Sequence, residues 1–223
     1  MKVVLFGASG MIGQGVLREC LLDPGVESVL SIVRTATVTK HPKLREIVRQ
    51  DLLKYDDISS DLSGFDACFF CLGVSSVGMK EEDYERITHG ITLAAAEVLS
   101  RLNPKMVFVY VSGAGTDSSE QGKTMWARVK GRTENALLKL PFAGAYMFRP
   151  GIIEPLDGIT SKTKGYRMFY AVSKPILPLA RAMFPNSVLT TRQIGQAMLN
   201  VVRSGAPKRI LESTDIRAAA GIR

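Results

Sequence analysis

The feature that most constrains the fold is a short apolar run that passes directly into three glycines at regular spacing. Val3–Phe6 is continuously apolar, which is typical of a parallel strand covered on both faces. Gly7, Gly10 and Gly13 follow, and the chain then continues with the spacing of a helix. The stretch therefore predicts a strand, a tight turn and a helix in direct succession.

The three glycines of this turn indicate an anion site. Gly7 lets the chain reverse, a side chain at Gly10 would hold the backbone away from a diphosphate, and Gly13 lets the helix lie close to the strand. The free amides and the dipole of a helix start favour a negative charge. The alternative is an ordinary glycine-rich turn, because Ala8 replaces the second glycine of the common dinucleotide fingerprint. We predict a dinucleotide diphosphate at Gly7, Ser9, Gly10, Met11, Ile12 and Gly13.

Length, composition and charge limit the class of protein. The 223 residues, 46% of them hydrophobic, suit one α/β domain that spans residues 1–223. No run approaches the ~18 apolar residues of a membrane span, and no signal-peptide pattern is present, so we expect a cytoplasmic protein without stable membrane insertion. The net charge of +8 suggests nucleic acid, but the basic residues are dispersed, and no nucleic-acid partner is expected.

The three cysteines do not suggest a disulfide framework. Cys68 and Cys71 form a C-x-x-C pattern inside an apolar run. An odd offset on a strand directs the two side chains to opposite faces, so core packing is favoured over redox chemistry. No metal site is predicted.

The second strand, Ser28–Val33, ends at an arginine. Proteins that bind NAD commonly carry an acidic residue near this point for the ribose hydroxyls, whereas this chain offers Arg34. A guanidinium can hold a 2′-phosphate through two parallel hydrogen bonds, so NADP(H) is preferred over NAD(H). Thr35, Thr37 and Lys40 could share the phosphate. The alternative is a solvated arginine in a loop.

The middle of the chain continues the alternation of strands and helices. Leu44–Val48 and Asp66–Leu72 are predicted strands, and Glu81–Leu102 is a predicted long helix. The turn after the fourth strand lacks a side chain at Gly73, so the backbone can approach the central part of a cofactor at Cys71, Leu72 and Gly73. His89 lies outside the apolar stripe of the helix and is expected to be satisfied or solvated rather than catalytic.

Two further strands, Met106–Val111 and Gly144–Phe148, complete a doubly wound parallel sheet of six or seven strands, the Rossmann-like α/β class. Ser112 opens the loop after the first of them. A parallel sheet places its chemistry beyond the carboxyl ends of the strands. The hydroxyl-rich loop that begins at Ser112 is therefore expected where the sheet places its chemistry, and the turn at Arg149 could be a simple Pro-Gly turn after a core strand.

Several motifs resemble the atypical and extended short-chain dehydrogenase/reductases, and especially their Tat-interacting-protein-like branch. The motifs are the G-x-x-G-x-x-G turn, Phe70–Gly73, Val129–Gly131 and Phe148–Gly151, and the likeness covers essentially the whole chain. The resemblance implies an NAD(P)-dependent oxidoreductase or epimerase-like enzyme that acts on a small carbonyl or hydroxyl compound. It also implies that Asp51 contacts the adenine amino group with Leu52 on the ring, and that the nicotinamide carboxamide meets the backbone at Pro150 and Ile152.

The resemblance also assigns catalytic positions. The family uses a serine after the fifth strand and a Y-x-x-x-K motif, in which the lysine lowers the phenol pKa and holds the ribose. Lys130 is retained here, whereas Trp126 stands at the tyrosine position and Ser112 or Gly113 at the serine position. An indole N–H is a donor only and cannot exchange a proton. The remaining candidate donors are Ser112, Thr116, Thr124 and water, and the alternative is a redox-sensing or scaffold protein that only binds NADP(H).

The last third of the chain is less readable. Residues 152–190 include an apolar segment broken by prolines, which suits a substrate lid, a homodimer surface or a membrane-surface patch. Thr190 and Thr191 are expected to cap a helix over Arg192–Val202, and Arg209–Leu211 to form a last strand. The tail, residues 218–223, is expected to fray.

Overall fold

The computed structural model of the chain describes residues 1–159 and 188–221. Its main sheet contains β1 (Lys2–Phe6), β2 (Ser28–Val33), β3 (Leu44–Val48), β4 (Ala67–Phe70), β5 (Val107–Val111), β6 (Gly144–Arg149) and β9 (Ile210–Glu212). The strand order is β3-β2-β1-β4-β5-β6-β9, and every neighbouring pair is parallel. This confirms the predicted Rossmann-like α/β domain.

The strand order reverses between β1 and β4. The sheet extends through β2 and β3 on one side of this point and through β5, β6 and β9 on the other. In register, Phe6 pairs with Phe70, Phe70 with Tyr110, and Tyr110 with Met147. The four central strands therefore end side by side, and the loops that follow them meet at one edge, where open α/β sheets bind ligands.

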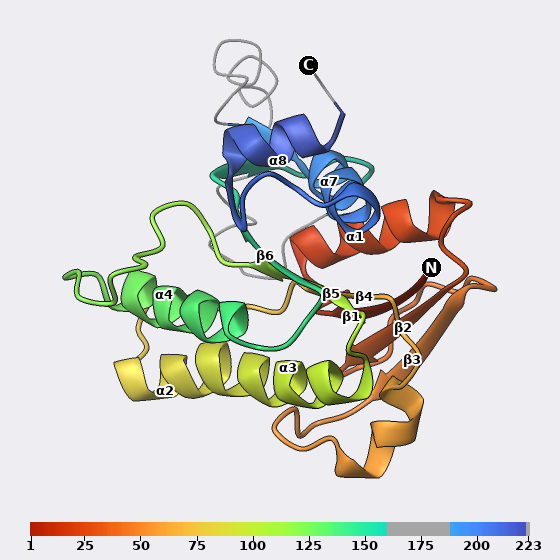
Figure 1. The fold of residues 1–223 in the computed structure, drawn as a ribbon, viewed down its shortest axis with the longest axis horizontal. Coiled ribbons are helices and arrows are strands. Elements are labelled where there is room, and N and C mark those ends of the chain that lie inside the picture. The colour runs from red at the N-terminus through yellow and green to blue at the C-terminus, as the bar shows by residue number, and fades with distance from the viewer. Residues whose placement is uncertain (160–187, 222–223) are drawn as a thin grey trace.

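Helices cover both faces of the sheet. One face carries α1 (Met11–Leu22), α7 (Thr191–Ser204) and α8 (Ser213–Ala219), and the other carries α2 (Glu81–Glu85), α3 (Ile91–Leu102) and α4 (Met125–Leu138), as Figure 1 shows. Alternate residues of β1 serve the two cores. Val3 and Leu5 pack in the cluster under α1 and α7, whereas Val4 and Phe6 pack in the cluster under α3. Both faces are thus buried, as the continuous apolar run of β1 predicts.

The cysteines take part in these cores. Cys68 packs in the cluster of Val4 and Phe6, and Cys71 packs against the cluster of Val3 and Leu5. The two thiols therefore lie on opposite sides of the sheet, which confirms the prediction from their odd offset. Burial raises the pKa of both thiols above the ordinary value.

The long helix expected over residues 81–102 is present but contains a π turn. Arg86–Gly90 forms this turn between α2 and α3. It places His89 against α4, with Nδ1 3.3 Å from the Thr133 hydroxyl oxygen, and burial lowers the pKa of the imidazole. His89 is thus a partnered side chain, in agreement with the sequence prediction.

The C-terminal part differs from the prediction in two respects. Ser213–Ala219 forms α8, and Ile216 is fully buried, so the expectation of a frayed tail is wrong for residues 218 and 219. A second, two-stranded parallel sheet, β7 (Ile152–Glu154) with β8 (Val188–Thr190), was not expected. A three-residue strand carries too few residues for a visible alternation of apolar and polar positions.

The helix after β8 begins at Thr191, one residue before the prediction, and Thr190 alone is its cap. Thr190 caps α7 through a capping box with Gln193, in which the Thr190 hydroxyl accepts from the Gln193 amide. The lid, dimer or membrane-patch prediction for residues 152–190 lies mostly outside the described residues. Within the described ranges, no helix is long and apolar enough to cross a membrane.

Candidate functional site

The turn between β1 and α1 is built around glycine. Gly7 has a φ of +81°, and the Gly10 amide donates to the Gly7 carbonyl at 2.9 Å. A Cβ on Gly13 would lie 2.0 Å from the Gly7 carbonyl oxygen. The helix start is therefore held directly against the turn, and Gly10 is its N-cap without a side-chain partner. The amides of the first turn, from Met11 to Gly13, have no intrahelical acceptor and can receive an anion.

The turn after β4 lies against the first turn. A Cβ on Gly7 would lie 2.6 Å from the carbonyl carbon of Cys71 and from the amide nitrogen of Leu72, so the two turns touch through their backbones. Gly73 has no atom within 4 Å of the place where its Cβ would be. Space for a ligand therefore borders the second turn at Gly73, beside the diphosphate turn.

Arg34 follows β2 at the same edge of the sheet and is exposed. Gln50 donates to the Arg34 backbone carbonyl at 2.9 Å, which fixes the main chain where the arginine leaves the strand. The loop after Arg34 has a pocket on each of its two sides. The pocket toward α1 has a volume of 690 Å³ and is lined in part by Ser9, Thr35 and Thr37.

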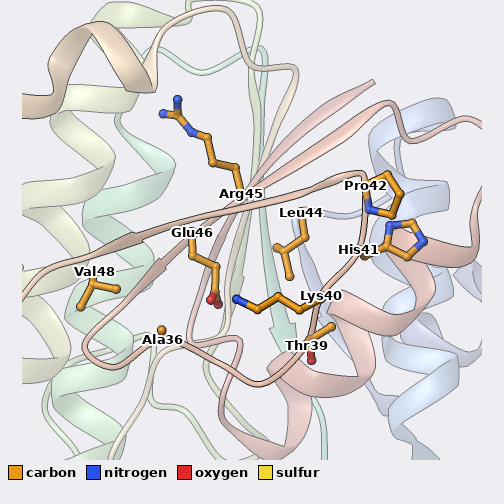
Figure 2. A pocket seen from close by; sticks show the side chains of 9 residues that line it. All are labelled: Ala36, Thr39, Lys40, His41, Pro42, Leu44, Arg45, Glu46 and Val48. Carbon is orange, nitrogen blue, oxygen red and sulfur yellow. The ribbon is translucent and has the colours of Figure 1, made fainter.

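The second pocket lies between the same loop and β3, and has a volume of 720 Å³. Lys40 and Glu46 point toward each other in it (Figure 2). One Glu46 oxygen accepts from the Thr37 amide at 3.0 Å, which ties the loop to the edge strand. Arg45 forms an ion pair with Asp61 at 2.5 Å. The loop that would face a 2′-phosphate is thus anchored at both Gln50 and Glu46.

Asp51 and Leu52 follow β3. The Asp51 carboxylate accepts from the Leu53 amide at 2.8 Å, which is the geometry of a turn residue. Leu52 is 4% exposed and packs in the core with Phe6. Its side chain therefore presents little surface to an adenine ring, and the exposed carboxylate of Asp51 is the group of this pair that can reach one.

The loop after β5 begins with a buried hydrogen-bond network. Ser112 Oγ lies 2.5 Å from Glu134 Oε1 and 3.1 Å from the Phe148 carbonyl oxygen. Glu134 is 0% exposed and forms an ion pair with Arg149 at the end of β6. Arg149 also donates to Ser118 Oγ at 2.6 Å. Glu134 thus joins α4 to the carboxyl ends of β5 and β6, and it accepts the hydrogen bond that the Ser112 hydroxyl donates.

The remainder of this loop is fixed by one carboxylate and one close contact. Asp117 accepts from the Ser119 hydroxyl at 2.6 Å and from the Gly122 amide at 2.6 Å, and these hydrogen bonds lower its pKa. A Cβ on Gly131 would lie 1.7 Å from the Asp117 carbonyl oxygen. The loop and α4 therefore pack with their backbones in contact.

Trp126 and Lys130 lie on one face of α4, as their offset of four predicts. The Lys130 ammonium is 6.0 Å from the centre of the Trp126 ring and donates to the Ser112 carbonyl oxygen. A Cβ on Gly115 would lie 3.4 Å from the indole, so the ring rests on the loop after β5. Burial lowers the pKa of Lys130 to about 8, and the charge of Glu134 acts in the opposite direction.

The turn after β6 borders the same region. Pro150 is buried, and its carbonyl accepts from the Ala114 amide at 2.9 Å. The Gly151 amide donates to Ser213 Oγ at 2.9 Å and is therefore occupied. Ile152 is 48% exposed. Of the groups after Pro150, Ile152 is thus the one that a ligand at this edge can meet.

Comparison with known proteins agrees with this geometry. The sequence profile of the NAD(P)H-binding family matches residues 7–138, from the diphosphate turn to the end of α4. The chain belongs to this family. It is an atypical short-chain dehydrogenase/reductase-like member, as the resemblance in the sequence indicates.

Individual relatives of this NAD(P)H-binding protein are distant. Protein HTATIP2 of Rattus norvegicus is 26% identical over 202 residues, 84% of this chain and 81% of that protein. Protein FMP52, mitochondrial, of Meyerozyma guilliermondii is 24% identical over 154 residues, 69% of this chain and 65% of that protein. Among solved structures, the Bordetella bronchiseptica enzyme WbmF with NAD+ has a TM-score of 0.69 at 14% identity and covers 99% of this chain and 77% of its own. That likeness concerns the fold.

The residues of this chain around the turns after β1 and β4 fit a dinucleotide. Methyl groups at Gly7 and Gly13 would meet backbone, whereas the space beside Gly73 is open. Free amides face this space from the start of α1, and an arginine follows β2. Such a cradle admits a diphosphate and leaves a guanidinium at the adenosine side.

Sequence reasoning missed the roles of Glu134 and Arg149. Both are buried charged residues, and an arginine at the end of the buried run Ala145–Phe148 is a signal for a buried partner. The partner itself could not be read from the sequence. It depends on how α4 is rotated against β6.

Proposed function

We propose that the chain is an NADP(H)-dependent oxidoreductase or epimerase-like enzyme that acts on a small carbonyl or hydroxyl compound. The observation that carries the proposal is the position of Lys130, whose ammonium lies against the loop after β5 at the edge where the diphosphate turn also lies. When bound, NADP(H) would supply or accept a hydride. The protein holds the dinucleotide, excludes water and moves a proton.

The chain's own residues divide these tasks. The amides of Met11, Ile12 and Gly13 would hold the diphosphate, and Arg34 the adenosine end. Cys71 to Gly73 would border the middle of the cofactor, and Pro150 and Ile152 the nicotinamide end. Calorimetry with NADPH tests this division, and absence of binding at millimolar concentration would overturn the whole proposal.

The preference for NADP(H) over NAD(H) rests on Arg34. A bidentate, charge-assisted contact to a 2′-phosphate contributes on the order of 1.5–3 kcal/mol. We expect Arg34→Ala to weaken NADPH binding by about 10- to 100-fold and to leave NADH binding unchanged. Arg45→Ala is the matched control, because Arg45 borders the neighbouring pocket but is paired with Asp61. Equal losses for both nucleotides with Arg34→Ala would refute the preference.

The reaction is tested by following NADPH absorbance across varied carbonyl compounds, with the wild type and with Trp126→Tyr. The substitution places a phenol four residues before Lys130, on the same face of α4. We expect turnover to rise with Trp126→Tyr, because a phenol at this position adds a group that can deliver a proton to the substrate oxygen. No turnover by either protein would count against the enzyme.

A second candidate is a redox-sensing or scaffold protein that binds NADP(H) without turnover. The position of Trp126 favours it, because the indole rests on Gly115 where the family places its phenol. Measurable turnover that is lost in Lys130→Ala would exclude this candidate. NADPH-dependent binding of a partner protein, without turnover, would support it.

We further propose a cytoplasmic protein that forms a homodimer and has no nucleic-acid partner. The fungal relatives that are called mitochondrial make the mitochondrion the alternative location. Cell fractionation decides the location, light scattering decides the oligomeric state, and a gel-shift assay with random DNA and RNA decides the nucleic-acid question.

A further inference from the structure

The candidate proton donors that contain a hydroxyl are occupied or badly placed. Ser112 Oγ is held between Glu134 and the Phe148 carbonyl, both of which are acceptors. Thr116 Oγ1 donates to the Gly113 carbonyl at 2.7 Å. Thr124 is the exposed N-cap of α4, six residues before Lys130, which places it about 9 Å away along the helix axis and on another face. Each of these hydroxyls is therefore either hydrogen-bonded within the protein or placed on another face of α4 from Lys130.

Trp126 cannot serve as the proton donor either. Its indole N–H can donate a hydrogen bond but cannot give up its proton at accessible cost. The ring does shape the site, because it lies on Gly115 and 6.0 Å from the Lys130 ammonium. The indole ring of Trp126 thus covers one side of the Lys130 ammonium and keeps water away from that side.

Lys130 is the protonated group that the described residues bring to this place. Its ammonium has three protons, and the hydrogen bond to the Ser112 carbonyl uses one. The space next to it is the loop at Gly113, where a Cβ would lie 3.8 Å from the ammonium nitrogen. The absence of a side chain at Gly113 leaves room for a substrate oxygen beside the amine.

We propose that Lys130 itself exchanges the proton with the substrate oxygen, in place of the missing tyrosine. This rests on the proposed oxidoreductase function. In the direction of reduction, an N–H bond of the ammonium breaks and an O–H bond forms on the substrate oxygen, and the hydride for the carbonyl carbon is what a bound dinucleotide would supply. Lys130 is left as a neutral amine and takes a proton back from water. The reverse direction begins with the neutral amine, which removes the hydroxyl proton.

The charged surroundings of Lys130 suit this role. Burial lowers the pKa of Lys130 to about 8, so both protonation states are accessible near neutral pH, as an acid–base catalyst requires. From α4 itself, Glu134 acts in the opposite direction and keeps the amine protonated. From β6, Arg149 pairs with that carboxylate, and from the loop after β5 the Ser112 carbonyl accepts from the ammonium. Glu134 is thus a positioning residue.

The first experiment needs neither substrate nor nucleotide. Trp126 is the single tryptophan of the chain, so its emission reports the charge on an amine 6.0 Å away. We expect a fluorescence titration of the free protein with a midpoint near pH 8. The transition should vanish in Lys130→Met and move to lower pH in Glu134→Gln, because the carboxylate charge is removed. Glu212→Gln, at the exposed end of the same network, is the control and should leave the midpoint unchanged.

The second experiment avoids substitutions that could fail to fold. In wild-type protein with 13C-labelled lysine, the side-chain resonance that titrates near pH 8 is assigned to Lys130 by its proximity to Trp126. A lysine near Trp126 that remains charged above pH 9.5 would overturn the proposal, whatever the variants do. With NADPH binding intact, this result refutes only the role of Lys130, whereas loss of NADPH binding refutes the proposed function.

The third experiment uses turnover once a substrate responds. We expect the rate of reduction to fall with rising pH, with the midpoint found by fluorescence, and Lys130→Met to lose about 10²- to 10⁴-fold in kcat. The pH dependence should disappear in that variant. A pH-independent wild-type rate, or Lys130→Met with the wild-type pH profile, would show that water delivers the proton.

Discussion

Gly13→Ala tests the contact on which the diphosphate turn is built. The new Cβ would lie 2.0 Å from the Gly7 carbonyl oxygen, whereas real Cβ atoms essentially never approach a heavy atom closer than 3.0 Å. The start of α1 must therefore withdraw by about 1 Å, and overpacking of this kind typically costs about 1–3 kcal/mol. Alanine recovers up to about 1 kcal/mol through its higher helix propensity.

The two effects leave a modest net loss of stability, about 0–2 kcal/mol, or a decrease in Tm of at most roughly 8 °C for a chain of this size. Nucleotide binding should suffer more. A turn displaced by 1 Å loses one or two charge-assisted hydrogen bonds, each worth about 1.5–3 kcal/mol, so the Kd for NADPH should rise at least about tenfold. Calorimetry at a temperature well below both melting transitions measures this directly.

Gly90→Ala is the matched control for Gly13→Ala. Gly90 is also helical, and a Cβ there would lie 3.7 Å from a Leu53 methyl group, an ordinary contact. We expect equal or slightly higher stability and unchanged NADPH affinity. If Gly13→Ala binds NADPH as tightly as the wild type, the diphosphate does not lie on this turn and the reasoning fails.

Three further predictions concern stability. Arg149→Met leaves Glu134 buried without its ionic partner, which costs about 3–5 kcal/mol and should lower Tm by roughly 6–20 °C in calorimetry, whereas Glu212→Gln should stay within about 1 kcal/mol. The pKa of Lys130 is about 8 in the folded chain and 10.5 ordinarily, so the unfolded chain binds more protons between these values. The free energy of unfolding from urea titrations should therefore gain a contribution that rises from pH 8 to 10.5 and is absent in Lys130→Met. Thr190→Ala removes the capping box of α7 and should cost about 0.5–2 kcal/mol by urea unfolding, and a loss below 0.3 kcal/mol would contradict that role.

The strands could be predicted because their signals are local. Ser28–Val33 and Leu44–Val48 were predicted with the bounds that the structure has, because each is a short run rich in Val, Ile and Leu. The π turn at Arg86–Gly90 could not be predicted, since the apolar positions of the surrounding helix keep a spacing of three and four across it. Helix α8 was missed because Ile216 is the one buried residue within it, which is too few for a visible apolar stripe.

The candidate site divides in the same way. Gly7, Gly13 and the common face of Trp126 and Lys130 follow from spacing alone, and the structure places them at one edge of the sheet. The occupied hydroxyl of Ser112 does not follow from spacing, because its partner Glu134 lies 22 residues away on another element. Which side chains are free to react therefore depends on tertiary contacts, which spacing in the sequence does not show.

The small sheet of β7 and β8 has a consequence for how such chains can diverge. Ile152 pairs with Val188 and Glu154 with Thr190, so the parts of the chain that flank residues 160–187 are fixed beside each other. The entropic cost of a connection between two fixed points grows only logarithmically with its length, so extra residues between β7 and β8 would add little to that cost. We therefore expect relatives to differ in the length and sequence of the connection between β7 and β8, while the turns that would hold the dinucleotide stay the same.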